Sequence, residues 1–150
     1  QALLKDFLFA KGEAEHHFVS FDYTPYFAGG RNNESCRYYT AETSYISGLR
    51  RKEDNPVLRF RQAISVTESE QQNNTIRLTL VHTCTYARAE EHDFYYNRQL
   101  PAWYDVILKE TNNGWRIESM HSANHEHTPL EAEHRGKIEE LEKLAAEQYR

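Results

Sequence analysis

His82 and Asp105, in the middle of the chain, could together transfer a proton. His82 lies on a predicted strand and shares one face of it with apolar side chains, Leu78, Leu80 and Cys84. By the same alternation Asp105 shares a face with Trp103 and Ile107, and we expect both faces to point into the protein. A buried pair of this kind could abstract a proton from a bound small molecule. The alternative is a buried histidine satisfied by one hydrogen bond and an aspartate near a strand edge.

The spacing of His121, His125 and His127 suggests a second kind of chemistry, metal binding. Zinc requires three or four nitrogen or sulfur ligands held on a rigid frame. These histidines instead straddle the end of a predicted strand and a polar connector, and Glu126 is the adjacent carboxylate. We interpret them as part of a solvated linker, with a pH-sensitive contact as the alternative. The sequence therefore predicts no metal and no other cofactor.

Aromatic side chains make up 13% of the chain, and many of them are tyrosines. Exposed tyrosine and tryptophan side chains can form platforms that bind sugars or peptides. Tyr86, Trp103 and Tyr104 are the candidate ligand-binding residues of this type. The alternative is that the aromatic residues pack in the core and against loops.

Charge and hydropathy exclude several classes of partner. The formal net charge is −5 and the isoelectric point is about 5.9, so the chain repels the phosphates of nucleic acid. A short basic cluster at 50–52 is followed at once by Glu53 and Asp54, which favours a solvated helix end. No apolar run reaches the ~18 residues that cross a membrane. We predict no nucleic-acid partner and no membrane span.

Known catalytic motifs are missing from the sequence. It contains no P-loop, Rossmann fingerprint, HExxH or CxxC pattern. Cys36 and Cys84 have no metal-ligand spacing, and a disulfide between them would require export, so their redox state stays open. We lean towards a fragment that is not itself an enzyme.

The elements that position these residues follow from hydrophobic periodicity. Apolar spacing predicts a helix over 2–11 ended by Gly12, and another over 41–52 capped by Thr40. Alternating patterns predict strands at 57–67, 75–87, 101–108 and 115–120, with a charged loop over 89–100. Asn113-Gly114 predicts the last hairpin. A polar connector leads to a helix over 130–149, which we expect to leave the domain.

Helices followed by long bent strands and the closing segment Asn113-Gly114-Trp115-Arg116-Ile117 form a layout that resembles the cystatin-like cone of the NTF2-like superfamily. The strands that carry the resemblance are 57–66, 75–86 and 103–108. It implies an α+β fold over residues 1–122, with N-terminal helices packed on a curved, mostly antiparallel sheet. Residues 123–150 would then be a connector and a C-terminal helix. Enzymes of this superfamily, such as ketosteroid isomerases, place an Asp or His base inside the cone, where His82 and Asp105 are expected.

A narrower resemblance concerns the context of the domain. An NTF2-like segment followed by a polar connector and a charged helix is similar to the N-terminal region of secreted bacterial proteins with a C-terminal putative amidase domain. It implies a non-catalytic accessory or interaction module of a larger, exported protein, with an extracellular or cell-envelope location and the cytoplasm as the alternative. Its partners would be other domains of the parent protein or a second copy in a homodimer.

Two other functions stay open at this point. One is a small enzyme or ligand binder of the isomerase or cyclase type, which would use His82 and Asp105. The other is a tyrosine-lined module for sugars or peptides.

Overall fold

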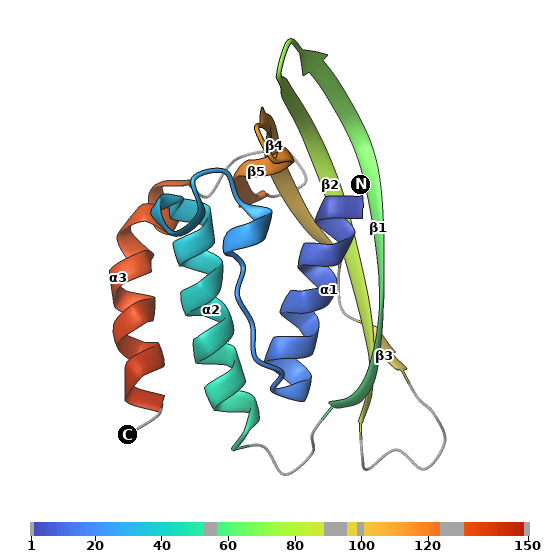
Figure 1. Cartoon of the computed structure of the whole chain (residues 1–150). Helices are drawn as coiled ribbons and strands as arrows, with labels where there is room; N and C mark the ends of the chain where they lie inside the picture. Colours follow the sequence, from blue (N-terminus) through green and yellow to red (C-terminus); the bar gives the residue numbers. More distant parts are fainter. Residues whose placement is uncertain (1, 53–56, 89–95, 99–100, 124–130, 149–150) are drawn as a thin grey trace.

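The computed structural model describes residues 2–52, 57–88, 96–98, 101–123 and 131–148 (Figure 1). Two helices come first, α1 (Ala2–His17) and α2 (Glu34–Arg50), joined through the 3-10 turns η1 (Thr24–Tyr26) and η2 (Gly30–Asn32). The strands are β1 (Val57–Gln72), β2 (Thr75–Arg88), β3 (Tyr96–Arg98), β4 (Ala102–Thr111) and β5 (Gly114–Ala123), and the helix α3 (Glu131–Gln148) ends the chain. The predicted α+β class is confirmed.

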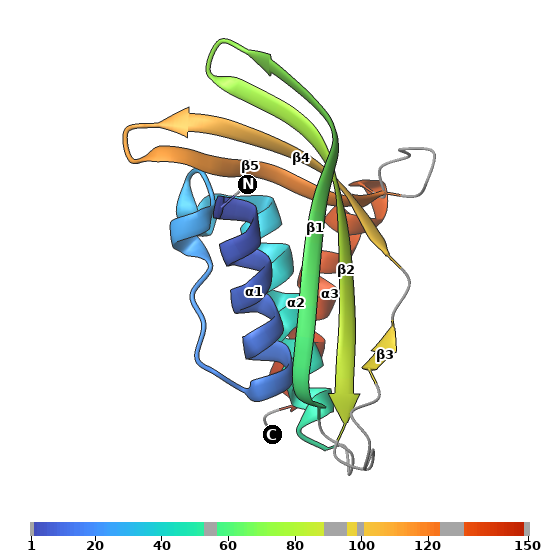
Figure 2. The same ribbon diagram turned by 90° about the vertical axis from the view of Figure 1, so that its right-hand side faces the viewer.

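The strands form one antiparallel sheet in the order β1-β2-β4-β5, and β3 pairs with the end of β2 that β4 leaves open. Helices α1 and α2 cover one face of this sheet, and α3 packs mainly on α2 and also contacts β5 (Figure 1). Register shifts interrupt the β1–β2 ladder between Val66 and Glu68 and the β4–β5 ladder at Ile107/Leu108. Such bulges increase local bending and twist. The β1–β2 hairpin accordingly curves and extends beyond the end of α1 (Figure 2).

The helices differ from the sequence prediction at their ends. Helix α1 continues through Gly12 to His17, because a glycine costs a helix only about 1 kcal/mol and the residues beyond it are buried. Helix α2 begins earlier than predicted: its N-cap is Asn33, whose side chain accepts a hydrogen bond from the Cys36 amide, and not Thr40. The predicted loop at 89–100 contains the short strand β3, and its remaining residues lie outside the described ones.

The core lies between the helices and the sheet and is rich in aromatic rings. The Phe7 ring contacts Tyr23, Phe27 and Tyr39 edge-on, with ring centroids 5.1, 5.1 and 5.6 Å away. Such edge-to-face pairs add about 0.5–1.5 kcal/mol to the burial of their area. The sheet contributes Leu80, Val106, Ile117 and Met120 to the same cluster.

Strand β5 is tied to the segment that joins the two helices. The Ala28 amide donates to the Ile117 carbonyl at 2.7 Å, and the Asn33 side chain donates to the Glu118 carbonyl at 2.8 Å. The Tyr39 hydroxyl donates to the Met120 carbonyl at 3.1 Å. These bonds fix α2 against the sheet.

Helix α3 does not leave the domain, contrary to our expectation. It packs along α2, where Ile138 and Ala145 are buried, and an exposed ion pair of 2.7 Å joins Arg37 to Glu142. The physical reason is that its few apolar residues share one helix face, which is buried only against a neighbouring helix. No helix in the described ranges is both long enough and apolar enough to cross a membrane. The boundary at residue 122 stays a prediction.

Candidate functional site

A polar cluster of the buried Lys11 and Glu15 with the half-buried Glu42 is the first candidate site. On α1, Leu4, Phe7 and Leu8 form the buried apolar stripe, and the next turns of the same face carry Lys11 and Glu15. Only 11% of the Lys11 side chain and 9% of the Glu15 side chain are exposed. Charged residues at such positions must be paired, because burying an isolated charge is very costly.

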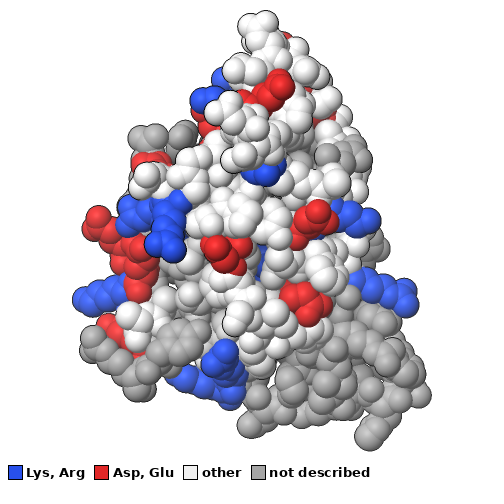
Figure 3. All heavy atoms as spheres, viewed as in Figure 1, with Lys and Arg blue, Asp and Glu red and all other residues white. Residues whose placement is uncertain are grey.

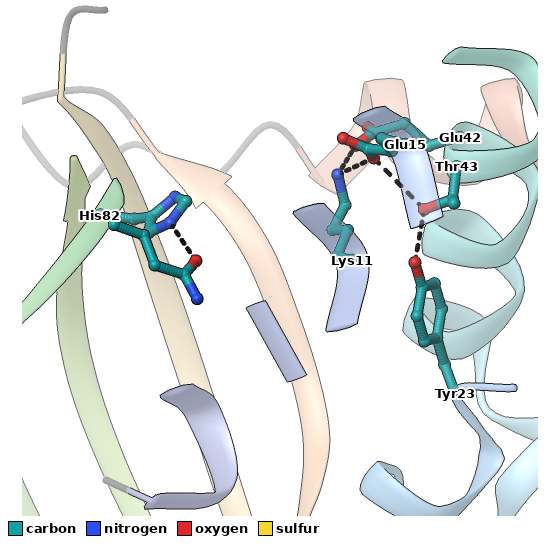
Figure 4. A network of polar contacts seen from close by, with 7 residues as sticks. Lys11, Glu15, Tyr23, Glu42, Thr43 and His82 are labelled. Carbon is teal, nitrogen blue, oxygen red and sulfur yellow. Dashed lines mark hydrogen bonds and ion pairs between the residues drawn. The ribbon is translucent and has the colours of Figure 1, made fainter. Parts of the chain in front are cut away.

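Pairing comes from both helices. The Lys11 ammonium group forms ion pairs with Glu15 one turn away on α1 and with Glu42 on α2, the latter at 2.7 Å (Figure 4). Burial alone would lower the pKa of Lys11, but the two carboxylates outweigh it and hold this pKa well above its ordinary value. Lys11 is therefore charged at neutral pH, and one ammonium group faces a pair of carboxylates.

A hydrogen-bond chain extends this cluster to the loop before α2. The Thr43 hydroxyl donates to Glu15 at 3.2 Å. Its single proton is then in use, so the Tyr23 hydroxyl, 2.8 Å away, is the donor to the Thr43 oxygen (Figure 4). Burial raises the pKa of Tyr23, which keeps this phenol protonated.

His82 projects from the sheet towards the same region. Its Nε2 lies 3.1 Å from Oε1 of Gln62 on β1 (Figure 4). Because the amide oxygen can only accept, Nε2 carries the proton and Nδ1 keeps its lone pair. Burial, followed by the charge of Lys11, lowers the pKa of His82 to about 4, so the ring is neutral at pH 7. The Gln62 amide nitrogen is buried and has no hydrogen-bond partner among the described residues.

The two sets of groups line one small pocket of about 50 Å³ between α1 and the sheet. Lys11 and Glu15 come from the helix, and Gln62, His82 and Tyr104 come from the strands. A space of this size accommodates a water or a small ion. Its volume is far below the ~300–1,000 Å³ of a typical small-molecule site.

The structure does not bring His82 and Asp105 together. Across β2 and β4, Leu80 pairs with Tyr104 and Thr79 pairs with Asp105, so Tyr104 shares the helix-covered face with His82 and Asp105 lies on the opposite face. Asp105 there accepts a hydrogen bond from the Thr79 hydroxyl at 3.4 Å. The expected inward orientation of Asp105 is wrong. Both faces of β4 carry apolar residues, so alternation alone could not tell them apart.

A larger groove of about 570 Å³ lies on the outer face of the sheet. It is lined by side chains from β1, β2, β4 and β5, among them Glu68, Glu70, Arg77, Asp105 and His121. Direct cross-strand pairing places Glu68, Thr79, Asp105 and His121 in one row across the sheet. The outer face therefore carries the larger and more acidic of these two cavities.

The remaining predicted site residues that the structure describes, Trp103, Tyr104 and His121, do not form one surface. Trp103 and Tyr104 are adjacent on β4 and project from opposite faces, and the side chain of Tyr86 lies outside the described ones. Tyr104 lines the inner pocket, where burial raises its pKa. His121 lines the outer groove, whereas His125 and His127 lie outside the described residues. Within the described ranges no cluster of His, Cys, Asp and Glu could hold a metal ion.

Sequence reasoning missed Lys11, Glu15, Glu42 and Gln62. A signal for the first two was present, because their helical spacing continues the apolar stripe of α1 and therefore places them on its buried face. Glu42 and Gln62 enter the site only through the packing of α2 and the β1–β2 register, so no local pattern marks them.

Acidic and basic side chains are interspersed on the face of the molecule that carries the helices (Figure 3). The basic groups visible there do not gather into a stripe of the kind that follows a phosphate backbone.

The sequence matches no protein-family model and no curated protein. The fold is similar to a solved structure of Rv3472, described as a function unknown protein from Mycobacterium tuberculosis, with a TM-score of 0.53. That match covers 99% of this chain and 87% of the other at 15% identity. At this identity the similarity concerns the arrangement of helices and strands, and supports the α+β architecture described above.

Proposed function

We propose that this chain is a non-catalytic interaction module with an NTF2-like fold, part of a larger exported bacterial protein. Its partner would be another domain of that protein. The observation that carries the proposal is the contrast between the two cavities: the inner pocket is about 50 Å³ and the groove on the outer sheet face is about 570 Å³. Between the described residues, the inner pocket is well below the ~300–1,000 Å³ of a typical small-molecule site, so it does not fit a substrate of that size.

The contacts of the inner charges also favour a structural role. Lys11 is paired with carboxylates on both α1 and α2, and Thr43 donates to one of them. A buried network that is satisfied internally rigidifies a core and helps to specify it. Here it joins the two helices that cover the sheet.

The test is amide NMR mapping of this chain, labelled with ¹⁵N, against the rest of the parent protein added in trans. We expect shifts at outer-face positions of the sheet, such as Thr79, Asp105 and Ser119. A small-molecule screen that instead shifts Lys11, Gln62 and His82, with turnover of the molecule that binds, would overturn the proposal.

A second function has one observation in its favour. The Gln62 amide nitrogen is a buried donor without a partner in the described structure, and it lies beside the neutral His82 in the inner pocket. A small acceptor, such as a carboxylate or a carbonyl oxygen, would satisfy that donor and lie near the Lys11 charge. This ligand-binding reading replaces the pair of His82 and Asp105 with His82 and Gln62. Titration with acetate, formate and acetone tests it, since saturable shifts at His82 that Gln62→Leu abolishes are its expected result.

A further inference from the structure

We propose that the groove on the outer sheet face binds an extended, basic protein segment whose Lys or Arg side chains recur every third residue. The inference rests on the proposed interaction function and identifies the chemistry of the partner.

Pairing across the strands sets the layout of the groove. Glu68 on β1, Thr79 on β2 and Asp105 on β4 follow one another in direct register, and Glu70, Arg77 and Ile107 form the neighbouring row. Adjacent strands are about 4.8 Å apart, so Glu68 and Asp105 are separated by roughly 10 Å across the sheet. The groove therefore presents Glu68 and Asp105 at a defined spacing across the strands.

An extended segment can match this spacing. In a polyproline II conformation, residues i and i+3 lie on the same side of the segment and are about 9.3 Å apart. Basic side chains at those positions would reach the row that contains Glu68 and Asp105. Ile107, which lines the same groove, offers an apolar surface for the aliphatic stems of Lys or Arg.

The charge balance of the groove selects a cationic partner. Among the described residues that line it, Arg77 is the one arginine or lysine, against the carboxylates Glu68, Glu70 and Asp105. Glu68 and Glu70 are exposed, and the register places Arg77 directly across from Glu70. The described lining thus holds more carboxylates than arginine or lysine side chains, with His121 across from Asp105, and such an acidic surface attracts cations and accelerates their association.

A second copy of the chain fits this groove poorly. A two-fold interface brings the same patch of both subunits together, so the acidic rows would face each other. Like charges placed in this way cost several kcal/mol. The same charges repel nucleic acid. The occupant that the groove favours is therefore a basic segment of a protein.

Fluorescence anisotropy with a labelled peptide of repeated Lys-Pro-Val triplets tests the inference. We expect saturable binding that weakens as salt increases, and no binding of the matched Glu-Pro-Val peptide. The variant Glu68→Gln/Glu70→Gln should bind the basic peptide about tenfold more weakly. The control Glu139→Gln/Glu140→Gln removes the same charge from exposed positions on α3 and should stay within about twofold of the unmodified chain.

An equal loss of affinity for the basic peptide in the groove variant and in the α3 control would overturn the inference, because it would show attraction by net charge alone. Equal binding of the acidic peptide, or no saturable binding of the basic one, would also overturn it. If the rest of the parent protein still shifts the amide NMR signals of the outer sheet face in these cases, the interaction function stands, and only the basic chemistry proposed for its partner is wrong. If those shifts are absent as well, both fail.

Discussion

Lys11 on α1 and Glu42 on α2 form an ion pair of 2.7 Å beside the aromatic and aliphatic core. Glu15, on the same helix as Lys11, forms a second ion pair with the ammonium group. A buried cation between carboxylates from two helices links those helices directly. Several measurable properties of the protein depend on it and on its neighbours.

Replacing Lys11 with methionine should destabilise the protein by about 3–5 kcal/mol, because buried Glu15 and half-buried Glu42 would both lose the ammonium group that they face. Chemical denaturation monitored by circular dichroism measures this change. Lys5→Met, at an exposed position of the same helix, is the control and should change the free energy of unfolding by less than about 0.5 kcal/mol. Adding Glu15→Gln and Glu42→Gln to Lys11→Met should restore much of the loss. A Lys11→Met protein as stable as its control would contradict the role of the network.

The stability of the protein should fall in acid through His82. Its pKa in the folded protein is about 4 and the ordinary value is 6.5, so between these values the unfolded chain binds the proton and the folded chain does not. The free energy of unfolding therefore falls as the pH drops from about 6.5 to 4. Urea denaturation at a series of pH values measures this fall in the free energy of unfolding. The fall should be about 1–3 kcal/mol smaller in His82→Gln than in the unmodified protein. Identical pH profiles for the two proteins would be inconsistent with a buried neutral histidine.

Tyr39→Phe should lower the free energy of unfolding by about 1–2 kcal/mol, since it removes the buried hydroxyl that donates to the Met120 carbonyl. Tyr26→Phe is the matched control: its ring also packs on Phe7, and its hydroxyl forms no hydrogen bond with the described residues. We expect that variant to change the thermal midpoint by at most about 2 °C. Equal effects of the two substitutions would mean that the Met120 contact does not hold α2 to β5.

Docking of α3 should depend on its buried apolar side chains and little on its surface ion pair. Ile138 is 6% exposed, so Ile138→Ala should cost about 2 kcal/mol or more. Glu142→Gln breaks the ion pair with Arg37, in which both side chains are nearly half exposed, and should cost less than about 1 kcal/mol. Hydrogen exchange of α3 amides compares the two variants. Faster exchange in Glu142→Gln than in Ile138→Ala would reverse this ranking.

Local chemistry made parts of the fold predictable. The Asn113-Gly114 pair predicted the β4–β5 hairpin. In the structure Asn112 and Asn113 form the turn, and Gly114 begins β5 opposite Thr111 with a φ of 98°, which glycine adopts without the strain of a Cβ. The long alternating runs predicted β1 and β2, because a half-buried strand repeats its hydrophobic pattern every second residue. The ends of α1 and α2 were less predictable, since packing outweighed the small cost of Gly12 and favoured the Asn33 cap.

The candidate site was predictable only in part. His82 was identified because a polar residue interrupted an apolar strand face, and it does line the inner pocket. Asp105 was assigned to the wrong face, because Trp103 and Ile107 beside it are as apolar as Tyr104 and Val106. Only the pairing of Leu80 with Tyr104 decides which of the two alternating groups of β4 side chains points at the helices.

By itself, the amino-acid sequence determined the α+β class, the long strands and the last hairpin, because these depend on periodicity and turn chemistry within a few residues. The tertiary structure decided the rest: which face of β4 is covered, that α3 packs on α2, and that Lys11 meets Glu42. Those relationships join segments that are distant in the sequence. They are set by strand register and by helix packing, which a local pattern does not encode.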